Sequence, residues 1–398
     1  MRMRIASVGG MLMLTLLLSA ATPAAASFTA PLPDRGDWVT IGGLDEPRRG
    51  HSAALLADGT VLVVGGVHGR GRPVLTAELV YPASGATRPA GVLPFGLSEH
   101  DAVALPDGRV LVAGGRGGHS LCAPYPALVW DPATLTFQPV SAIEDANGAS
   151  ATLLDDGRVL LAGGGTRCSW KPQDGLMIAL AHDGLDRARI WDPLSGEVTT
   201  TGSLGDARSY HDAVQLDDGR VLAVGGVSID YRTTTGVVTP IAALEVFDPA
   251  TRTWLPAGEY PGTGIADVAL LLDGRVAIAE RLRGHPGLAL WDPAVDDIVA
   301  GDGVPAPRDG VVAAVLADGR LMLVGGYRIG ERADRPLASA VIWDPETGQR
   351  EAIRYPRAGA DAGHTITVLA DGTVLVIGGR EMHGRGDRTV GSIEAWQP

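Results

Sequence analysis

Four histidines occupy the same place in a recurring pattern. Each stands seven residues before an Asp-Gly pair; they are His51, His100, His211 and His364. Imidazole nitrogens bind metal ions and move protons near neutral pH, so repeated histidines suggest a metal centre or a catalytic group. In the alternative, structural role, each ring packs inside the fold and bonds neighbouring backbone. The elements around the histidines decide between the two.

The histidines belong to a repeat that returns about every 50 residues. Seven Asp-Gly pairs align its copies, at Asp58, Asp107, Asp156, Asp218, Asp273, Asp318 and Asp371. A short run of small apolar residues precedes each pair, and a Val/Leu-rich run such as "TVLVVGG" follows most of them. An Asp-Gly loop suits a type I′ hairpin, and a run without alternation indicates a strand buried on both faces. This period indicates a repeat architecture.

Two further strands are predicted in each copy. The third ends in an aromatic residue before an Asp-Pro turn, as in "ARIWDP", and the fourth is clearest in "TRTWLPAG". Four antiparallel strands per copy, stacked around an axis, predict an all-β, seven-bladed β-propeller over residues 36–398. The last copy stops at its third strand, "SIEAWQP", and "GDWVTIGG" from Gly36 onward can supply the missing fourth. An N-terminal strand is therefore expected to close the last blade.

These residues resemble the kelch repeat. The diglycines, the aromatic residue with Asp that ends the third strand, and the Arg-x-x-His entries "RRGH" and "RSYH" are similar to those of secreted bacterial propellers in the galactose-oxidase and kelch superfamily. The diglycines are Gly65, Gly66, Gly114, Gly115, Gly163, Gly164, Gly225, Gly226, Gly325, Gly326, Gly378 and Gly379. Glu280 and Arg281 replace the diglycine in the fifth copy. The resemblance implies the fold but no single activity, because such propellers include binding scaffolds, sugar-modifying enzymes and copper oxidases.

The propeller fold favours the structural role for the histidines. Strand side chains point to the two faces of their sheet, which in a propeller look at adjacent blades. The histidines are therefore expected between blades, and no metal site is predicted. The diglycines are expected to permit close approach or positive backbone angles. Aromatic residues such as Phe247 are expected in the core, with a sugar-stacking platform as the less favoured alternative.

The first 26 residues have the pattern of a secretory signal peptide. Arg2 and Arg4 precede an apolar run, and "ATPAAAS" offers cleavage after Ala26. We predict residues 1–26 as the signal peptide and 27–35 as a short linker. The protein is then secreted or periplasmic; an uncleaved anchor is less favoured because the run is short.

The net charge of −13 limits the partners of the protein. An acidic surface repels phosphate backbones and anionic membrane surfaces, so nucleic acid is not expected as a partner. No later segment resembles a membrane span, and a monomer without membrane insertion is predicted. The expected partner is a protein or a polysaccharide.

The chain has two cysteines, Cys122 and Cys168. They follow the second strands of two neighbouring copies. In an exported protein such a pair predicts a disulfide, and without a local CxxC or His partner it makes a poor zinc site. The disulfide would join two neighbouring loops on one face of the propeller.

The variable segments between second and third strands all leave the propeller on one face, called here the loop face. In the third and fourth copies they run from about Gly165 to Arg187 and from about Val227 to Ala242. Loops carry most binding function on rigid scaffolds. The candidate ligand-binding residues on this face are Arg116, His119, Arg167, Trp170, Lys171, Tyr231, Arg232, Tyr327, Arg328, Arg380 and His383. Such groups suit an anionic or sugar ligand; charge that serves solubility is the alternative.

The sequence favours an exported scaffold that binds a protein or a glycan through its loop face, without a cofactor. A carbohydrate-active enzyme, either a sugar epimerase or lyase or, less favoured, a copper-radical oxidase, is the alternative. The oxidases of this superfamily need a cysteine cross-linked to tyrosine and further Tyr and His ligands, which we could not match here. A purely structural envelope component is a third possibility. A deep pocket on the loop face would favour a small ligand, and a flat rim a protein partner.

Overall fold

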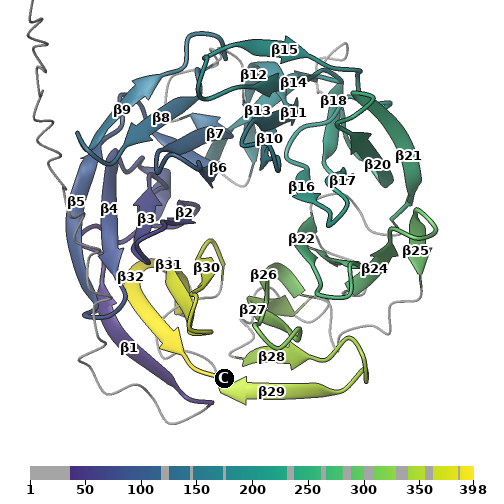
Figure 1. Cartoon of the computed structure of the whole chain (residues 1–398). Helices are drawn as coiled ribbons and strands as arrows, with labels where there is room; N and C mark the ends of the chain where they lie inside the picture. The colour runs from purple at the N-terminus through teal and green to yellow at the C-terminus, as the bar shows by residue number, and fades with distance from the viewer. Residues whose placement is uncertain are drawn as a thin grey trace, which may run out of the picture.

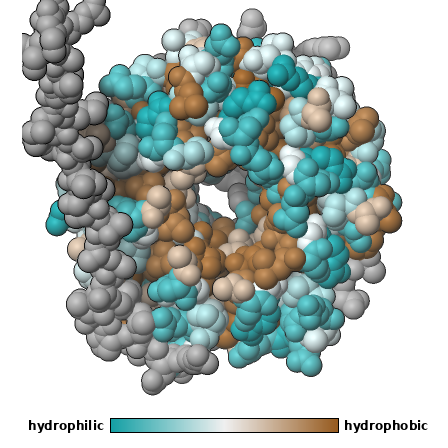
Figure 2. Space-filling view, viewed as in Figure 1, coloured by the Kyte–Doolittle hydropathy of each residue, from teal (hydrophilic) through white to brown (hydrophobic). Residues whose placement is uncertain are grey.

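The computed structural model describes residues 36–117, 125–143, 147–173, 176–230, 237–260, 266–280, 288–299, 308–328, 339–354, 362–383 and 386–398. Within these residues the chain forms seven four-stranded antiparallel sheets, which are the blades of a ring (Figure 1). The space-filling view shows that a channel stays open at the centre of the ring (Figure 2). The 3-10 turn Gly69–Gly71 is the only helical piece in this part of the chain. No helix long and apolar enough to cross a bilayer occurs among the described residues. The predicted all-β, seven-bladed architecture is confirmed.

Each blade runs from an inner strand at the channel to an outer strand at the rim. Blade 1 contains β2 (Ser52–Leu55), β3 (Val61–Val64), β4 (Thr76–Tyr81) and β5 (Ala86–Val92). Blade 2 contains β6 (Leu97–Ala104), β7 (Val110–Gly117), β8 (Leu128–Asp131) and β9 (Thr136–Pro139). Blade 3 contains β10 (Ala149–Leu153), β11 (Val159–Gly163), β14 (Ala188–Trp191) and β15 (Val198–Thr200). Blade 4 contains β16 (Asp212–Gln215), β17 (Val221–Val224), β20 (Ala243–Asp248) and β21 (Thr253–Glu259).

The remaining three blades follow the same order. Blade 5 contains β22 (Ala266–Leu270), β23 (Val276–Glu280), β24 (Leu288–Asp292) and β25 (Asp297–Val299). Blade 6 contains β26 (Arg308–Val315), β27 (Leu321–Arg328), β28 (Ser339–Trp343) and β29 (Arg350–Arg354). Blade 7 contains β30 (Thr365–Val368), β31 (Val374–His383), β32 (Gly386–Trp396) and, as its outer strand, β1 (Trp38–Gly43). The fifth blade is regular although its sequence departs from the repeat.

The two ends of the described chain meet in blade 7. Strand β1 pairs with β32, and Trp38 lies opposite Trp396 (Figure 1). This confirms the expected closure by an N-terminal strand, which removes an open sheet edge from the ring.

The Asp-Gly turns are fixed by their own side chains. At Asp107 the carboxylate accepts the backbone N–H of Arg109 at 3.0 Å and the Nε of the same arginine at 2.8 Å. The arginine then reaches blade 3, where its guanidinium donates to the carbonyl of Pro193 at 2.7 Å. The turns therefore help to hold neighbouring blades together at the end of the ring opposite the loop face.

The core lies between the blades. The second strands are buried, as the continuous Val/Leu runs predicted, and the third-strand aromatics pack against them. The indole N–H of Trp130 donates to the carbonyl of Ala90 on blade 1 at 2.7 Å, and that of Trp291 donates to Ala257 on blade 4 at 2.9 Å. Trp130 and Trp291 thus combine apolar burial with a hydrogen bond across a blade junction.

Two segments expected to be loops contain paired strands. Strands β12 (Gly165–Gln173) and β13 (Leu176–Gly184) form one hairpin after blade 3's second strand, and β18 (Val227–Asp230) and β19 (Val237–Pro240) form another in blade 4. Both segments vary between the copies of the repeat, which led to the loop interpretation. The apolar run "LMIALA" was the signal for a strand.

Candidate functional site

Three of the histidines bridge adjacent blades at the start of the inner strands. Their rings are buried, and each Nε2 lies within hydrogen-bond distance of a hydroxyl on the preceding blade. The pairs are His51 with Thr365 at 3.1 Å, His100 with Ser52 at 2.8 Å and His211 with Ser150 at 2.8 Å. His364 is buried at the equivalent place in blade 7. The Nε2 atoms of the three bridging histidines are thus engaged in contacts between blades.

A carboxylate replaces the hydroxyl where the next blade lacks a histidine. Blades 3, 5 and 6 have Ala149, Ala266 and Val311 at the histidine position. The preceding blades supply aspartates whose Oδ2 accepts a backbone N–H of the next inner strand: Asp101 from Ala151 at 2.9 Å, Asp212 from Val268 at 3.1 Å and Asp267 from Ala313 at 2.6 Å. We call this pattern the junction rule: a hydroxyl on one blade pairs with a histidine on the next, and an aspartate on one blade pairs with a backbone N–H on the next.

Burial keeps the bridging imidazoles neutral. It lowers the pKa of His100 to about 4 and that of His211 to about 3, with the charge of Arg208 adding to the second shift. Burial also lowers the pKa of His51 well below its ordinary value. These rings are therefore uncharged at neutral pH.

In five blades the residue before the histidine position has a left-handed backbone. It is Gly50, Glu99, Gly148, Tyr210 and Gly363 in blades 1, 2, 3, 4 and 7, with φ of 58°, 53°, 64°, 56° and 70°. Backbone bonds join these residues between blades: Glu99 donates to the carbonyl of Gly50 at 2.7 Å, and Tyr210 to that of Gly148 at 2.7 Å. We call this set of five residues the collar of the channel.

Two collar positions carry side chains where the others use glycine. Left-handed backbone costs a residue other than glycine about 1–2 kcal/mol. Glycine on the preceding blade makes room for the tyrosine, since a Cβ on Gly148 would lie only 3.2 Å from the ring of Tyr210. A Cβ on Gly50 would lie 3.5 Å from Glu99 Cγ, which is an ordinary van der Waals contact. Residues in such conformations concentrate at functional sites.

Both side chains converge on Arg116, which extends from β7. Its Nε lies 3.0 Å from a carboxylate oxygen of Glu99, and its guanidinium carbon lies 4.9 Å from the centre of the Tyr210 ring. The negative charge of Glu99 raises the pKa of Arg116 above its ordinary value. Left-handed residues also occur at outer turns, for example Leu135 and Arg252. Glu99 and Tyr210 differ from these outer-turn residues because both of their side chains lie against one arginine at the channel.

The channel is hollowed at its loop-face end, called here the mouth. Its larger cavity measures about 680 Å³ and is lined by Arg49, Arg380 and Glu99 together with the three junction aspartates. An adjoining cavity of about 250 Å³ lies against Arg116 and Tyr210 and shares Glu99 and those aspartates. Figure 2 shows the open centre of the ring. The mouth is therefore a polar cavity lined by both signs of charge.

The sequence-predicted residues divide into three groups. Arg116 and Arg380 lie at the mouth. The backbone is described but the side chain is not for Arg167, Trp170, Lys171, Tyr327, Arg328 and His383. The same holds for Cys168 of the expected disulfide. Residues that lie wholly outside it are His119, Tyr231, Arg232 and Cys122.

Sequence reasoning missed Arg49, Glu99, Tyr210 and the aspartates at the mouth. The signal for Glu99 and Tyr210 was available in the repeat itself. Alignment of the copies puts them in a column that holds glycine at Gly50, Gly148 and Gly363. Glycine satisfies the backbone at this position, so a large polar residue there suggests that its side chain has a functional role.

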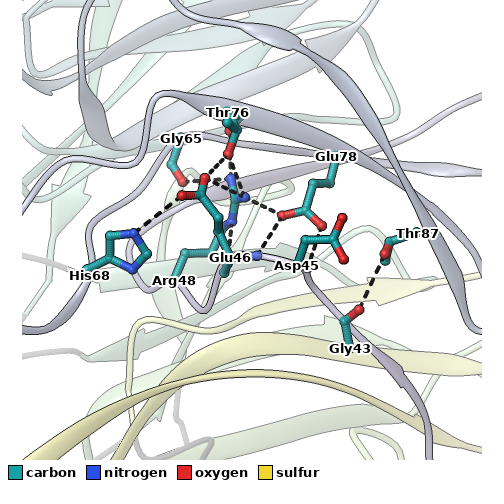
Figure 3. Close-up of polar contacts among 9 residues, drawn as sticks. All are labelled: Gly43, Asp45, Glu46, Arg48, Gly65, His68, Thr76, Glu78 and Thr87. Carbon is teal, nitrogen blue, oxygen red and sulfur yellow. Dashed lines mark hydrogen bonds and ion pairs between the residues drawn. The ribbon is translucent and has the colours of Figure 1, made fainter.

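A separate polar cluster, drawn for blade 1 in Figure 3, explains the Arg-x-x-His entries of blades 1 and 4. The guanidinium of Arg48 is fully buried and donates to the carbonyls of Gly65 and Thr76 and to the carboxylate of Glu78. Arg208 makes the same set of bonds in blade 4, to Gly225, Ala243 and Glu245. Because two blades repeat this clamp, we assign it to holding the diglycine exit against the third strand.

Comparison with known proteins yields a likeness of fold only. No family model and no curated protein matches the chain. Solved structures do match it, among them a fungal alcohol oxidase of the AA5 family in complex with copper, with a TM-score of 0.64 and 15% identity over 92% of this chain and 76% of that chain. The chain is similar to that oxidase in its propeller. At this identity the likeness leaves activity open.

Proposed function

We propose that this protein is an exported, kelch-type propeller that binds a glycan at the mouth of its channel. The cavity of about 680 Å³ is the observation that carries the proposal. Its volume lies within the range of about 300–1,000 Å³ usual for small-ligand sites, whereas a protein partner is better served by a flat rim. Export rests on the signal-peptide pattern of residues 1–26.

The chemistry of the lining supports a polyhydroxylated ligand. Guanidinium groups only donate hydrogen bonds and ionised carboxylates only accept them, whereas a sugar hydroxyl does both. Arg49 and Arg380 provide donors at the mouth, and Asp101 and Asp212 provide acceptors. Arg116 is already paired with Glu99, so it offers a positioned donor without a net positive charge. This pairing weakens the interpretation of the loop-face arginines as a site for a purely anionic ligand.

Tyr210→Gly tests the site without disturbing the scaffold. Glycine suits the left-handed backbone of the collar, as it does at Gly148, so we expect the variant to fold. Loss of the ring frees Arg116, and we expect glycan affinity to fall at least about tenfold, which corresponds to about 1.4 kcal/mol. The matched control is Arg252→Gly, a left-handed position in an outer turn.

The measurement is a glycan-array screen followed by calorimetric titration of the best ligand. Unchanged affinity in the Tyr210→Gly variant would contradict the collar site. Absence of any glycan that binds the wild-type protein would contradict the proposed function.

A copper oxidase on the same fold is the alternative that the structural neighbour raises. In the described part of the chain no three His, Cys, Asp or Glu side chains lie close enough together to hold a metal ion. His211, next to Tyr210, already contacts Ser150 through its Nε2. The described residues therefore do not fit a copper centre, and we derive no oxidation step. Stoichiometric copper in the purified protein would reverse this preference.

A further inference from the structure

A short turn of blade 1 carries positive charge beside the mouth. Val67 lines the larger cavity, and the residues that follow it, "HGRGR" at positions 68–72, form a turn at the surface that we call the basic turn. Arg70 and Arg72 are both exposed there. Arg70 is three residues beyond Val67, so their Cα atoms are at most about 11 Å apart. The basic turn therefore lies at the edge of the mouth.

The two arginines of the basic turn are not neutralised by a neighbouring carboxylate. Among the residues that the structure describes, no Asp or Glu pairs with Arg70 or Arg72. At the Asp-Gly turns, in contrast, each arginine pairs with the aspartate of its own turn; the pairs are Arg109–Asp107, Arg158–Asp156, Arg220–Asp218, Arg275–Asp273 and Arg320–Asp318. The basic turn therefore offers positive charge on a chain whose net charge is −13.

The backbone of the basic turn is held in one shape. The N–H of His68 donates to the carbonyl of Arg72 at 2.7 Å, and the N–H of Gly71 donates to the carbonyl of His68 at 3.1 Å. The ring of His68 is anchored beside Glu46, with 3.6 Å between Nε2 and a carboxylate oxygen (Figure 3). The positions from which the two arginines extend are thus set before a ligand arrives, which lowers the ordering cost of binding.

Arg70 has a backbone conformation that suits glycine better than arginine. Its φ is 62° and its ψ is 20°, in the left-handed region, where a Cβ is unfavourable. Glycine stands on both sides of it, at Gly69 and Gly71. An arginine at this position of a glycine-rich turn points to a role for its side chain, since residues in such conformations concentrate at functional sites.

We propose that the basic turn binds an acidic group, a carboxylate or a sulfate ester, of a glycan whose neighbouring sugar occupies the mouth. A guanidinium group forms paired, charge-assisted hydrogen bonds with the oxygens of such anions. The mouth offers both donors and acceptors and suits an uncharged sugar, whereas the basic turn offers only donors. The ligand class is therefore an acidic polysaccharide. This assignment rests on the proposed glycan-binding function and names the chemistry of its ligand.

Two pairs of tetrasaccharides form the test. One pair is tetragalacturonic acid and its methyl ester, and the other is a galactose tetrasaccharide with and without a sulfate ester. We expect the acidic member of at least one pair to bind about tenfold more tightly in calorimetric titration, which corresponds to about 1.4 kcal/mol. The pair that shows the difference identifies the anion. The advantage should shrink between about 0.05 M and about 0.5 M salt, because exposed charges are screened. Any acidic ligand from the glycan array is compared with its neutral form in the same way.

Two variants assign the difference to the basic turn. Arg70→Gly removes one charge and suits the left-handed backbone, so we expect the variant to fold and to lose about tenfold in affinity for the acidic ligand but none for the neutral one. Arg72→Gln keeps the carbonyl that holds His68 and should cause a smaller loss in the same direction. Arg252→Gly is the matched control, because Arg252 is also exposed and left-handed, with φ of 58°, but lies in an outer turn of blade 4.

The outcomes separate the two proposals. Equal affinities within both pairs, an acidic advantage that Arg70→Gly leaves intact, or an array that yields only neutral ligands would overturn the basic turn as an anion site and leave glycan binding in place. If neither the tetrasaccharides nor any array glycan binds the wild-type protein, the proposed function itself is wrong.

Discussion

Lowering the pH from about 7.5 to about 5.5 is expected to destabilise the propeller through its buried histidines. In the unfolded chain a histidine has a pKa near 6.5. In the folded protein burial lowers the pKa of His100 to about 4 and that of His211 to about 3, and it lowers that of His51 well below the ordinary value. The unfolded state therefore binds protons that the folded state does not. The stabilisation is complete above the unfolded pKa and is lost as the pH falls toward the folded values.

The size of the effect follows from the number of rings. At pH about 5.5 an unfolded histidine holds about 0.9 of a proton and a buried one almost none, which costs about 1.4 kcal/mol for each histidine. The three rings together give about 4 kcal/mol. That is a large part of the 5–15 kcal/mol usual for a folded protein.

Urea unfolding at a series of pH values measures this loss and counts the protons. The His100→Gln variant removes one titrating ring, and its amide can still bond the hydroxyl of Ser52. We expect proton uptake on unfolding at pH 5.5 to fall by about 0.9 in this variant, and by about 1.8 when His211→Gln is added. The reasoning fails if the variants keep the wild-type pH dependence, because the rings would then titrate equally in both states.

Three further predictions concern the scaffold. Ser150→Ala should lower the free energy of unfolding by about 1–3 kcal/mol, because it leaves a buried nitrogen of His211 without its hydroxyl partner. Ser150→Thr keeps a hydroxyl and should retain most of the wild-type stability. Urea unfolding of the two variants and the wild type measures the difference. Glu245→Ala should cost about 3–5 kcal/mol by leaving the buried Arg208 guanidinium without its carboxylate, seen as a lower Tm than for the exposed control Glu197→Ala. Cys122 and Cys168 should resist alkylation until a reductant is added, and free labelling of both would exclude the disulfide.

The fold could be predicted from the sequence because its signals are local and repeated. An Asp-Gly turn is determined by neighbouring residues, as the bonds between Asp107 and Arg109 illustrate. The position of β1 followed from counting strands, since the last copy lacked one. Hairpin β12–β13 was missed because its segment varies between copies, so the repeat gives no signal for strands there. Local signals thus predict turns well and insertions poorly.

The mouth was harder to predict because its contacts join distant copies. Arg116 of blade 2 meets Tyr210 of blade 4 across blade 3, a contact that depends on the curvature of the ring. The junction rule, in contrast, could have been found by aligning the copies. Ser52 lies in a copy that is followed by one with a histidine, and Asp101 lies in a copy that is followed by one without. This correlation between neighbouring copies cannot be seen when each copy is inspected alone.

The junction rule separates residues needed for the ring from residues added to it. It accounts for Ser52, Ser150 and the three aspartates by contacts that close the ring, so their substitution must change stability. It does not require Glu99, Tyr210 or Arg116, because blades 1, 3 and 7 fold with glycine at the collar. Asp212 belongs to both groups, since it holds β22 and lines the mouth. A substitution of Tyr210 should therefore change ligand affinity without changing stability. A substitution of Asp212 that removes its hydrogen-bond acceptor should lower both ligand affinity and stability.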